Sequence, residues 1–193
     1  FKNKDIKKNL NIFWEGQSHS NISIFRFLFK ILLNIKKYDI ILHIVTDAQY
    51  CYLGGRYFCV PTINILNKIF KGSKISIKLY NWSVENLIIA SAKCDIGLIP
   101  IPNKPRMQLK PENKLILMWM LGLPVITSDT KSYKRVMNEI QEDWTCKNMK
   151  DWTKKVYTLI EVKINREKYV KSINSFFENK YSSDIVTKQW DNI

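Results

Sequence analysis

The stretch KPENKLILMWMLGLPVITSDTKSY, residues 110–133, decides the fold of this chain. Pro111 suits the first position of a helix, because the N–H that proline lacks would have no partner there. Glu112 would then lie in the first turn, where the helix dipole favours an acid. Gly122 can adopt the left-handed conformation that ends a helix, and Pro124 prevents the helix from continuing. The first half of the stretch therefore predicts a short helix with a sharp end.

The second half of the stretch predicts a buried strand that leads into another helix. Residues 125–127 are Val-Ile-Thr, a short β-branched run that is typical of a strand inside a parallel sheet. Ser128, Asp129 and Thr130 are all good N-caps for a following helix. In α/β proteins, ligands bind where such strands end in a polar loop before a helix.

Two lysines precede and begin the first of these helices. Lys110 and Lys114 are four residues apart, so both lie on one face of the predicted helix. Helix N-termini bind anions, because several backbone N–H groups there point outward. The pattern indicates either a phosphate site or a surface helix with two solvated lysines, and this stretch alone leaves both open.

Composition favours an anionic partner for a soluble, globular chain. The 193 residues are 46% hydrophobic and 25% charged, and 31 basic against 17 acidic residues give a net charge of +14. A positive charge of this size favours nucleotides, nucleic acid or an anionic membrane surface. The lysines are spread along the whole chain without a long basic run or a nucleic-acid-binding motif, so we expect no nucleic-acid partner.

Cysteine and histidine usage argues against a metal site. The four cysteines show no CxxC spacing, and the chain has only two histidines, His19 and His43. We therefore expect no metal, and we expect scattered reduced thiols in a cytoplasmic protein. His43 lies within a predicted strand and is expected to be a core residue. The cysteines are Cys51, Cys59, Cys94 and Cys146.

No signal peptide or membrane-spanning segment is evident in the sequence. The longest uncharged apolar run, residues 115–126, is too short to span a bilayer and contains Gly122 and Pro124.

The remaining pattern alternates strands with helices from end to end. Ser83 is expected to cap the helix that follows the third strand, and Ser20 or Asn21 the first helix. Asn165 is a candidate cap for a late helix. Residues 47–73 are the least readable, with only a Gly54-Gly55 turn and a short helix predicted. Further strands are predicted at 11–14, 39–46, 74–82 and 95–99, and further helices at 21–37, 63–70, 83–93, 152–160, 167–177 and 182–190.

This order implies an α/β fold with right-handed crossovers. We predict a single doubly wound, Rossmann-like domain over residues 1–193, with a parallel sheet and helices on both faces.

Four segments, in this order, resemble one known family. They are Phe13–Gly16, a strand with a glycine turn; Leu79–Trp82, the end of a strand; Cys94–Pro100, an acidic-hydrophobic strand; and Lys110–Val125. Together the segments resemble the C-terminal, donor-binding domain of the GT-B fold glycosyltransferases of the "group 1" class. The last segment is the most specific of the four.

The resemblance implies that the chain binds a nucleotide-diphosphate sugar and takes part in transfer of the sugar to an acceptor. It implies no cofactor and no bound metal, because side chains and a helix N-terminus neutralise the diphosphate. Gly16 and Gln17 would approach the distal phosphate, and Trp82 would flank the base. The remaining donor-binding positions that the resemblance implies are Lys110, Asn113, Lys114, Ser128 and Tyr133.

One departure from the family pattern concerns the sugar and ribose contacts. Many relatives carry two glutamates eight positions apart, and the matching positions here are Leu109 and Leu117. Lys110-x-x-Asn113-Lys114 instead resembles a subset related to surface-polysaccharide and lipopolysaccharide assembly. The departure leaves open the donor, the catalytic residues, the stereochemical outcome and a catalytically degenerate relative.

The resemblance also implies a missing half. GT-B enzymes place the acceptor, and often the catalytic base, in an N-terminal domain that 193 residues cannot also hold. We expect the helices of residues 151–193 to pack back toward that absent domain, and the chain alone to bind donor weakly and transfer little. The acceptor would be a glycan or a lipid-linked molecule. A lipid-linked acceptor would suit peripheral contact with the inner face of the membrane through basic patches.

One alternative is a Rossmann-like nucleotide-binding module without a transferase role. The chain has no GxGxxG and no GxxxxGK[ST], which argues against dinucleotide and P-loop sites. Glu15 and Asp47 end strands at the expected ligand edge. We assign neither a catalytic role, because a carboxylate would repel a diphosphate.

Overall fold

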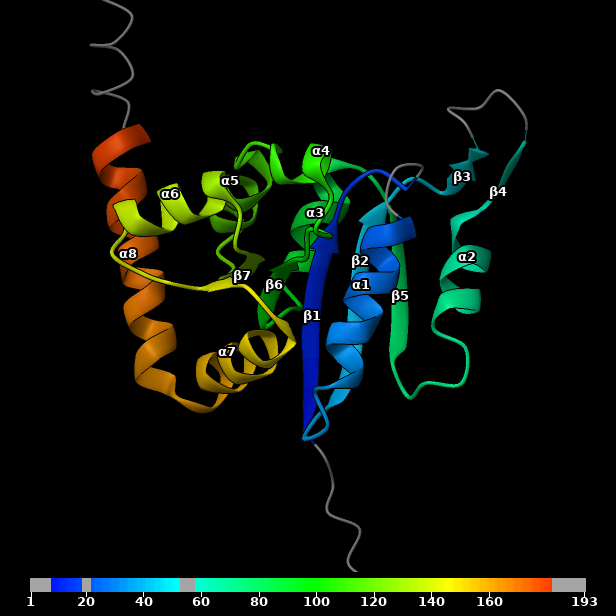
Figure 1. Cartoon of the computed structure of the whole chain (residues 1–193), viewed down its shortest axis with the longest axis horizontal. Helices are drawn as coiled ribbons and strands as arrows, with labels where there is room; N and C mark the ends of the chain where they lie inside the picture. Colours follow the sequence, from blue (N-terminus) through cyan, green and yellow to red (C-terminus); the bar gives the residue numbers. More distant parts are fainter. Residues whose placement is uncertain (1–7, 19–21, 53–57, 182–193) are drawn as a thin grey trace, which may run out of the picture.

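A six-stranded parallel sheet forms the centre of the molecule (Figure 1). The structure, a computed structural model, describes residues 8–18, 22–52 and 58–181. The strand order is β5-β2-β1-β6-β7-β8, and a separate antiparallel hairpin pairs β3 with β4. The strands are β1 (Asn9–Glu15), β2 (Asp39–Thr46), β3 (Gln49–Cys51), β4 (Cys59–Pro61), β5 (Ser76–Asn81), β6 (Ile96–Ile99), β7 (Val125–Ser128) and β8 (Thr145–Cys146).

Helices cover both faces of this sheet, which confirms the predicted doubly wound α/β fold. Figure 1 shows α1 and α7 in front of the sheet and α3 behind it. The contacts agree, because Trp14 of β1 packs on Phe25 of α1, whereas Gly97 of β6 lies against Met118 of α5. The helices are α1 (Ile22–Leu33), α2 (Thr62–Ile69), α3 (Val84–Ser91), α4 (Pro105–Gln108), α5 (Asn113–Met120), α6 (Lys131–Glu139), α7 (Met149–Glu161) and α8 (Lys163–Tyr181).

The switch in strand order lies between β1 and β6. The chain moves outward from β1 to β2 and β5, returns through α3 to β6, and then moves outward the other way. β1 pairs with β2 along its whole length, from Asn9 with Asp39 to Glu15 with Val45. Such a reversal leaves a crevice at the carboxyl ends of the two central strands.

The deciding stretch folds largely as its sequence indicates. Gly122 has φ +76°, its N–H donates to Trp119, and the N–H of Leu123 donates to Met118. This is a Schellman motif, which satisfies the last carbonyls of α5 before the chain turns into β7. Thr130 is the cap of α6, because its hydroxyl accepts a hydrogen bond from the N–H of Tyr133 at 3.3 Å.

Several predicted boundaries need correction. Pro111 and Glu112 precede α5, which begins at Asn113, so neither lies within the helix. Asn165 lies inside α8 and does not cap it. Asn148 instead caps α7 in a reciprocal capping box with Asp151, and the helix starts three residues before the predicted Trp152.

Short elements were absent from the sequence prediction. The hairpin of β3 and β4 falls in the stretch that was least readable, α4 was expected to be a loop, and β8 is only two residues long. The predicted Gly54-Gly55 turn, the Ser20 or Asn21 cap and the 182–190 helix lie outside the described residues.

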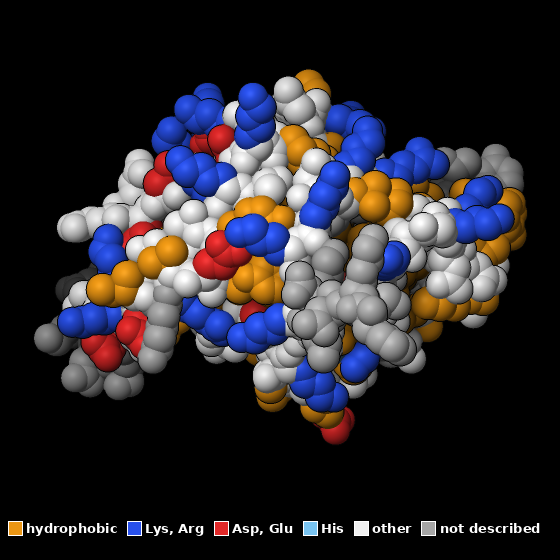
Figure 2. Space-filling model, turned by 90° about the horizontal axis from the view of Figure 1, so that it is seen from below, with side chains coloured by type: hydrophobic (Ala, Val, Ile, Leu, Met, Phe, Trp, Pro, Cys, Tyr) orange, Lys and Arg blue, Asp and Glu red, His pale blue; other side chains and the backbone are white. Residues whose placement is uncertain are grey.

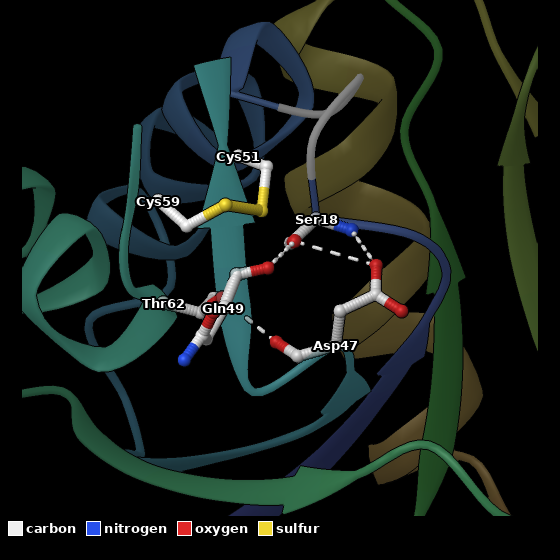
Figure 3. Close-up of a disulfide and its surroundings, with 6 residues drawn as sticks. All are labelled: Ser18, Asp47, Gln49, Cys51, Cys59 and Thr62. Atoms are coloured by element: carbon white, nitrogen blue, oxygen red, sulfur yellow. Dashed lines mark hydrogen bonds between the residues drawn. A yellow bond between two sulfur atoms is a disulfide. The ribbon is translucent and has the colours of Figure 1, made fainter. Parts of the chain in front are cut away.

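The expectation of four free thiols is wrong for two of them. Cys51 and Cys59 face each other across the hairpin and form a disulfide (Figure 3). Cys94 and Cys146 are free, and burial raises the pKa of the Cys94 thiol to about 12. Only two of the four cysteines are therefore reduced thiols, which weakens the argument for a cytosolic protein.

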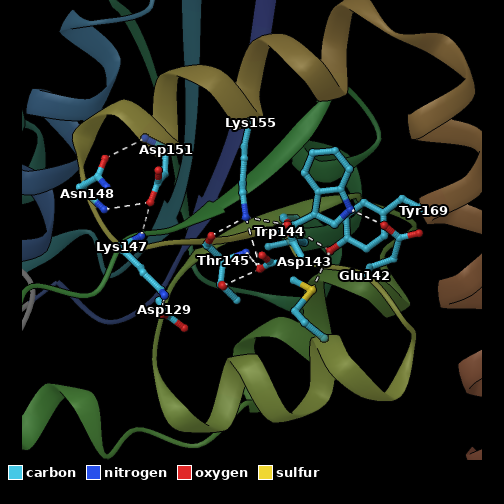
Figure 4. A network of polar contacts seen from close by, with 12 residues as sticks. Asp129, Glu142, Asp143, Trp144, Thr145, Lys147, Asn148, Asp151, Lys155 and Tyr169 are labelled. Carbon is cyan, nitrogen blue, oxygen red and sulfur yellow. Dashed lines mark hydrogen bonds and ion pairs between the residues drawn. The ribbon is translucent and has the colours of Figure 1, made fainter.

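A polar network fastens the last strand to the helices beside it (Figure 4). The Lys155 ammonium of α7 donates to the carbonyls of Asp143 and Thr145, both at 2.6 Å. On α8, the Tyr169 hydroxyl donates to the carbonyl of Val125 at 2.8 Å and accepts from the Trp119 indole at 3.1 Å. These bonds hold α7 and α8 against the β7–β8 end of the sheet.

The basic side chains are interspersed with other groups on the one face of the molecule that Figure 2 shows. Figure 2 shows lysine and arginine side chains spread among hydrophobic and neutral groups on the face seen from below. In the part of the chain that the structure describes, no helix is both long enough and apolar enough to cross a membrane.

Candidate functional site

A pocket of about 800 Å³ opens at the carboxyl ends of the central strands. It lies where the strand order switches, between the ends of β1 and β6, which is the usual ligand position in α/β sheets. Segments far apart in sequence line it: Trp14, Glu15, Gly16, Gln17, Ile24, Asp47, Trp82, Ile99, Pro100, Ile101, Lys110, Pro111, Asn113, Lys114, Leu117 and Tyr133.

The glycine turn after β1 forms one wall of the pocket. Gly16 has φ +145°, a conformation that side-chain-bearing residues rarely adopt, and its N–H donates to the Val45 carbonyl at 3.1 Å. A Cβ at this position would lie 2.5 Å from the Lys114 ammonium nitrogen. Glycine is therefore required for the lysine side chain to reach the backbone of the turn.

Three groups hold the Lys114 ammonium at this turn. Its Nζ donates to the Glu15 carbonyl, lies 3.4 Å from the Glu15 carboxylate, and sits 4.8 Å from the centre of the Trp14 ring. Burial lowers the pKa of Lys114, the neighbouring Glu15 carboxylate raises it, and Lys110 lowers it further. The result is a half-buried cation at the edge of the pocket.

Similar solved structures are glycosyltransferases. WaaG, a glycosyltransferase involved in lipopolysaccharide biosynthesis, matches 97% of this chain at 13% identity with a TM-score of 0.60, and 47% of WaaG is covered. The O-GlcNAc transferase of Thermobaculum terrenum matches 96% at 12% identity and TM-score 0.62, with 35% of that chain covered. The C-terminal domain of the group 1 family protein LpcC from Francisella tularensis matches 92% at 13% identity and TM-score 0.57, with 87% covered.

The chain has the fold of a GT-B glycosyltransferase C-terminal domain. It spans about half or less of the full-length GT-B proteins above and most of the isolated LpcC domain. At these identities the likeness is one of fold. No protein-family model matches the sequence, and no curated protein matches it in a sequence search.

The pocket brings together most of the residues that the sequence had singled out. Seven of the eight predicted donor-binding residues line it: Gly16, Gln17, Trp82, Lys110, Asn113, Lys114 and Tyr133. Trp82, directly after β5, is 53% exposed and lines the pocket. Lys110 lies in the loop before α5, and Asn113 is the first residue of α5.

Ser128 and Tyr133 differ in their placement. The Ser128 hydroxyl is buried, accepts from the N–H of Ile101 at 2.8 Å and donates to the same residue's carbonyl at 3.2 Å, and Ser128 is not among the pocket-lining residues. Its hydroxyl ties β7 to the loop after β6. Tyr133 lines the pocket from the first turn of α6, and burial, followed by Glu15 and Glu112, raises the pKa of its phenol.

The two positions of the family's glutamate pair lie apart. Leu117 lines the pocket, whereas Leu109 is 80% exposed on the segment before it and is not a lining residue. The pocket thus has an apolar wall at the position where many relatives carry the second glutamate.

Sequence reasoning set aside two carboxylates that line the pocket. Glu15 ends β1 and contacts Lys114, and Asp47 directly follows β2. One Asp47 carboxylate oxygen accepts the N–H of Ser18 at 2.8 Å (Figure 3). Their position at strand ends was the available signal, but the pairing of Glu15 with a lysine 99 residues away was not visible in the sequence.

His43 is a core residue, as expected. Its two ring nitrogens lie 3.1 Å from the Tyr80 hydroxyl and 3.2 Å from the Asn11 side-chain oxygen. In the described part of the chain, no group of three or more histidine, cysteine, aspartate or glutamate side chains could hold a metal ion.

Proposed function

We propose that this chain is the donor-binding half of a glycosyltransferase that uses a nucleotide-diphosphate sugar. The observation that carries the proposal is the pocket at the switch point, where the Lys114 ammonium meets the Gly16 turn beside Lys110 and the start of α5. A cation, backbone N–H groups and a helix N-terminus are the features that bind phosphates in α/β proteins.

Each wall of the pocket would have a distinct task in donor binding. Lys110 and Lys114 would neutralise the diphosphate, whose charge grows as the bond to the sugar breaks. The Gly16 turn, with the Lys114 ammonium packed against it, would approach the distal phosphate, and the half-exposed Trp82 ring would flank the base. We propose that this donor site works without a metal, because two lysines supply the positive charge.

The acceptor would bind in an N-terminal domain that completes the active site. A glycan or lipid-linked acceptor fits the surface-polysaccharide-type motif Lys110-x-x-Asn113-Lys114. We propose a cytoplasmic enzyme that contacts the inner face of the membrane peripherally. Catalytic residues are not assigned to this half.

A thermal-shift titration with UDP, GDP, CDP and their sugars tests the proposal. A ligand at 100 times its Kd stabilises the folded state by about 2.7 kcal/mol, which raises the Tm of a chain of this size by roughly 5–10 °C. We expect one base to give such a shift and Lys114→Gln to reduce it strongly. Lys68→Gln, which removes an exposed lysine from α2, is the matched control and should leave the shift unchanged.

A nucleotide-binding module without transferase activity remains the second candidate, because the position of Leu117 lacks a carboxylate that could contact sugar or ribose. The two candidates differ in one readout. A donor domain should respond more strongly to one nucleotide sugar than to the matching nucleoside diphosphate. Equal shifts would favour the binding module, and no shift at millimolar ligand would refute both.

A further inference from the structure

Glu15 presents an electrostatic problem for any anion site. Glu15 is only 6% exposed and lines the same pocket as Lys110 and Lys114. A buried carboxylate beside a bound phosphate repels it, and burial makes the repulsion stronger. The residue must therefore contribute something that offsets this cost, or the pocket does not take a phosphate.

The contacts of Glu15 indicate what it contributes. Its carboxylate lies 3.4 Å from the Lys114 ammonium, and its backbone carbonyl accepts a hydrogen bond from the same ammonium. Both groups belong to the last residue of β1, which pairs with Val45 of β2 and is therefore rigid. Trp14, one residue earlier, places its ring 4.8 Å below the same nitrogen.

A lysine side chain without such contacts samples many rotamers. Lys114 is the second residue of α5, and its nitrogen comes so close to the Gly16 turn that a single methyl group there would overlap it. Two adjacent residues of a strand thus hold the end of a long side chain from another element. This arrangement pre-organises the cation, which reduces the entropy lost when a ligand binds.

The Lys114 ammonium has both an acidic and a basic neighbour. Glu15 faces it from β1, Lys110 from the segment before α5, and Tyr133 of α6 and Asp47 after β2 line the same pocket. Burial and Lys110 lower the pKa of Lys114, and Glu15 is the group that raises it. Removing the Glu15 charge would let the ammonium lose its proton at a lower pH.

We propose that Glu15 is a positioning residue, which fixes the Lys114 ammonium at the Gly16 turn so that it meets a phosphate group of the ligand in one geometry. The inference rests on the proposed donor site and gives this carboxylate a role in it without contact to the reacting atoms.

A double-mutant cycle on the whole chain tests the proposal. Calorimetry would measure the Kd of the nucleoside diphosphate that the wild type binds, for Glu15→Gln, Lys114→Gln and the double variant. We expect Glu15→Gln to weaken binding about tenfold at pH 7, and to change Kd less than twofold when Lys114 is already glutamine. Glu15→Asp, which keeps the charge, should recover part of the loss.

The pH dependence supplies a readout that a purely structural role would not move. Binding should fall as the pH rises through the pKa of Lys114, and Glu15→Gln should move the midpoint of that fall to lower pH. An unchanged or tighter Kd in Glu15→Gln would overturn the proposal. An equal loss of affinity caused by Glu15→Gln in the wild type and in the Lys114→Gln variant would overturn it as well.

A ligand-free measurement separates this inference from the proposed function. The NMR signal of the Lys114 Cε, labelled with carbon-13, should titrate at lower pH and lose the ring-current shift of Trp14 in Glu15→Gln. If the wild type bound no diphosphate, the proposed function would fail, whereas an unchanged Lys114 signal would overturn the positioning role alone. If Glu15→Gln did not fold, Glu15→Asp would test the positional part of the comparison, because it keeps the charge but is one methylene shorter and so draws the carboxylate away from Lys114.

Discussion

At the scale of single residues, Gly16 and Gly72 provide a matched comparison. Both have positive φ, at +145° and +77°, but a Cβ on Gly16 would lie 2.5 Å from the Lys114 nitrogen, whereas one on Gly72 meets nothing within 4 Å. Backbone strain from alanine is therefore expected at both positions, at about 1–3 kcal/mol each. Only the first substitution also displaces a pocket cation.

We expect Gly16→Ala to abolish the nucleotide-induced thermal shift and Gly72→Ala to retain it. Urea unfolding would show both variants destabilised by about 1–3 kcal/mol, because both lose the conformational freedom of glycine. A Gly16→Ala chain that still bound nucleotide as tightly as Gly72→Ala would show that the close approach of Lys114 is not needed.

Single residues also show how far the site could be read from sequence. The four-residue spacing from Lys110 singled out Lys114, the turn after the first strand singled out Gly16, and the resemblance to the GT-B family singled out Trp82. All three line the pocket, and their roles in ligand binding stay predictions. The role of Glu15 was missed, since a carboxylate at a phosphate site reads as repulsive until its partner is known. Ser128 has a capping residue type, but Thr130 caps α6 and the Ser128 hydroxyl bonds to Ile101.

At the scale of elements, the β3–β4 hairpin is the part that was not predicted from the sequence. Its strands are three residues each, too short to show alternation, and a disulfide crosslinks them. The long strands were predicted within a few residues because burial on both faces makes them continuously apolar. β2 was placed with its observed bounds, Asp39–Thr46.

The hairpin adjoins the pocket through Gln49, whose carbonyl accepts the Ser18 hydroxyl at 2.9 Å (Figure 3). A crosslink over a sequence separation of 8 is worth about 2.5 kcal/mol in the chain-entropy model. We expect reduction of the disulfide, or the Cys51→Ser/Cys59→Ser double variant, to lower the free energy of unfolding by about that amount. The measurement is urea unfolding with and without reductant.

The double variant is also the control for the reductant, because it has no Cys51–Cys59 bond to lose. A reductant that destabilised the variant as much as the wild type would locate the effect elsewhere in the chain.

At the scale of the whole molecule, a nucleic-acid surface and a general excess of lysine are two of the explanations for the charge of +14. The described structure favours the second. Lysines are spread over the surface in Figure 2, and several pair with acids, as Lys37 does with Glu161 and Lys180 with Glu139.

We therefore expect duplex DNA to bind no more tightly than about 10 μM at roughly physiological salt, the range of sequence-independent contact. Filter binding at several salt concentrations is the measurement. Nanomolar binding with a steep salt dependence would instead establish a continuous phosphate-binding surface.

The pocket is assembled from the ends of β1, β2, β5 and β6 and from the starts of α5 and α6. No local segment contains it, so a ligand can bind only when the central sheet is complete. Ligand binding would then suppress the global unfolding of the structure rather than the local opening of single segments. Amide hydrogen exchange should slow together across these four strands at saturating nucleotide, by the same factor 1 + [L]/Kd, while the exchange of fraying helix ends stays unchanged. A nucleotide bound at this edge would thus stabilise residues as far apart as Trp14 and Tyr133 as one cooperative unit.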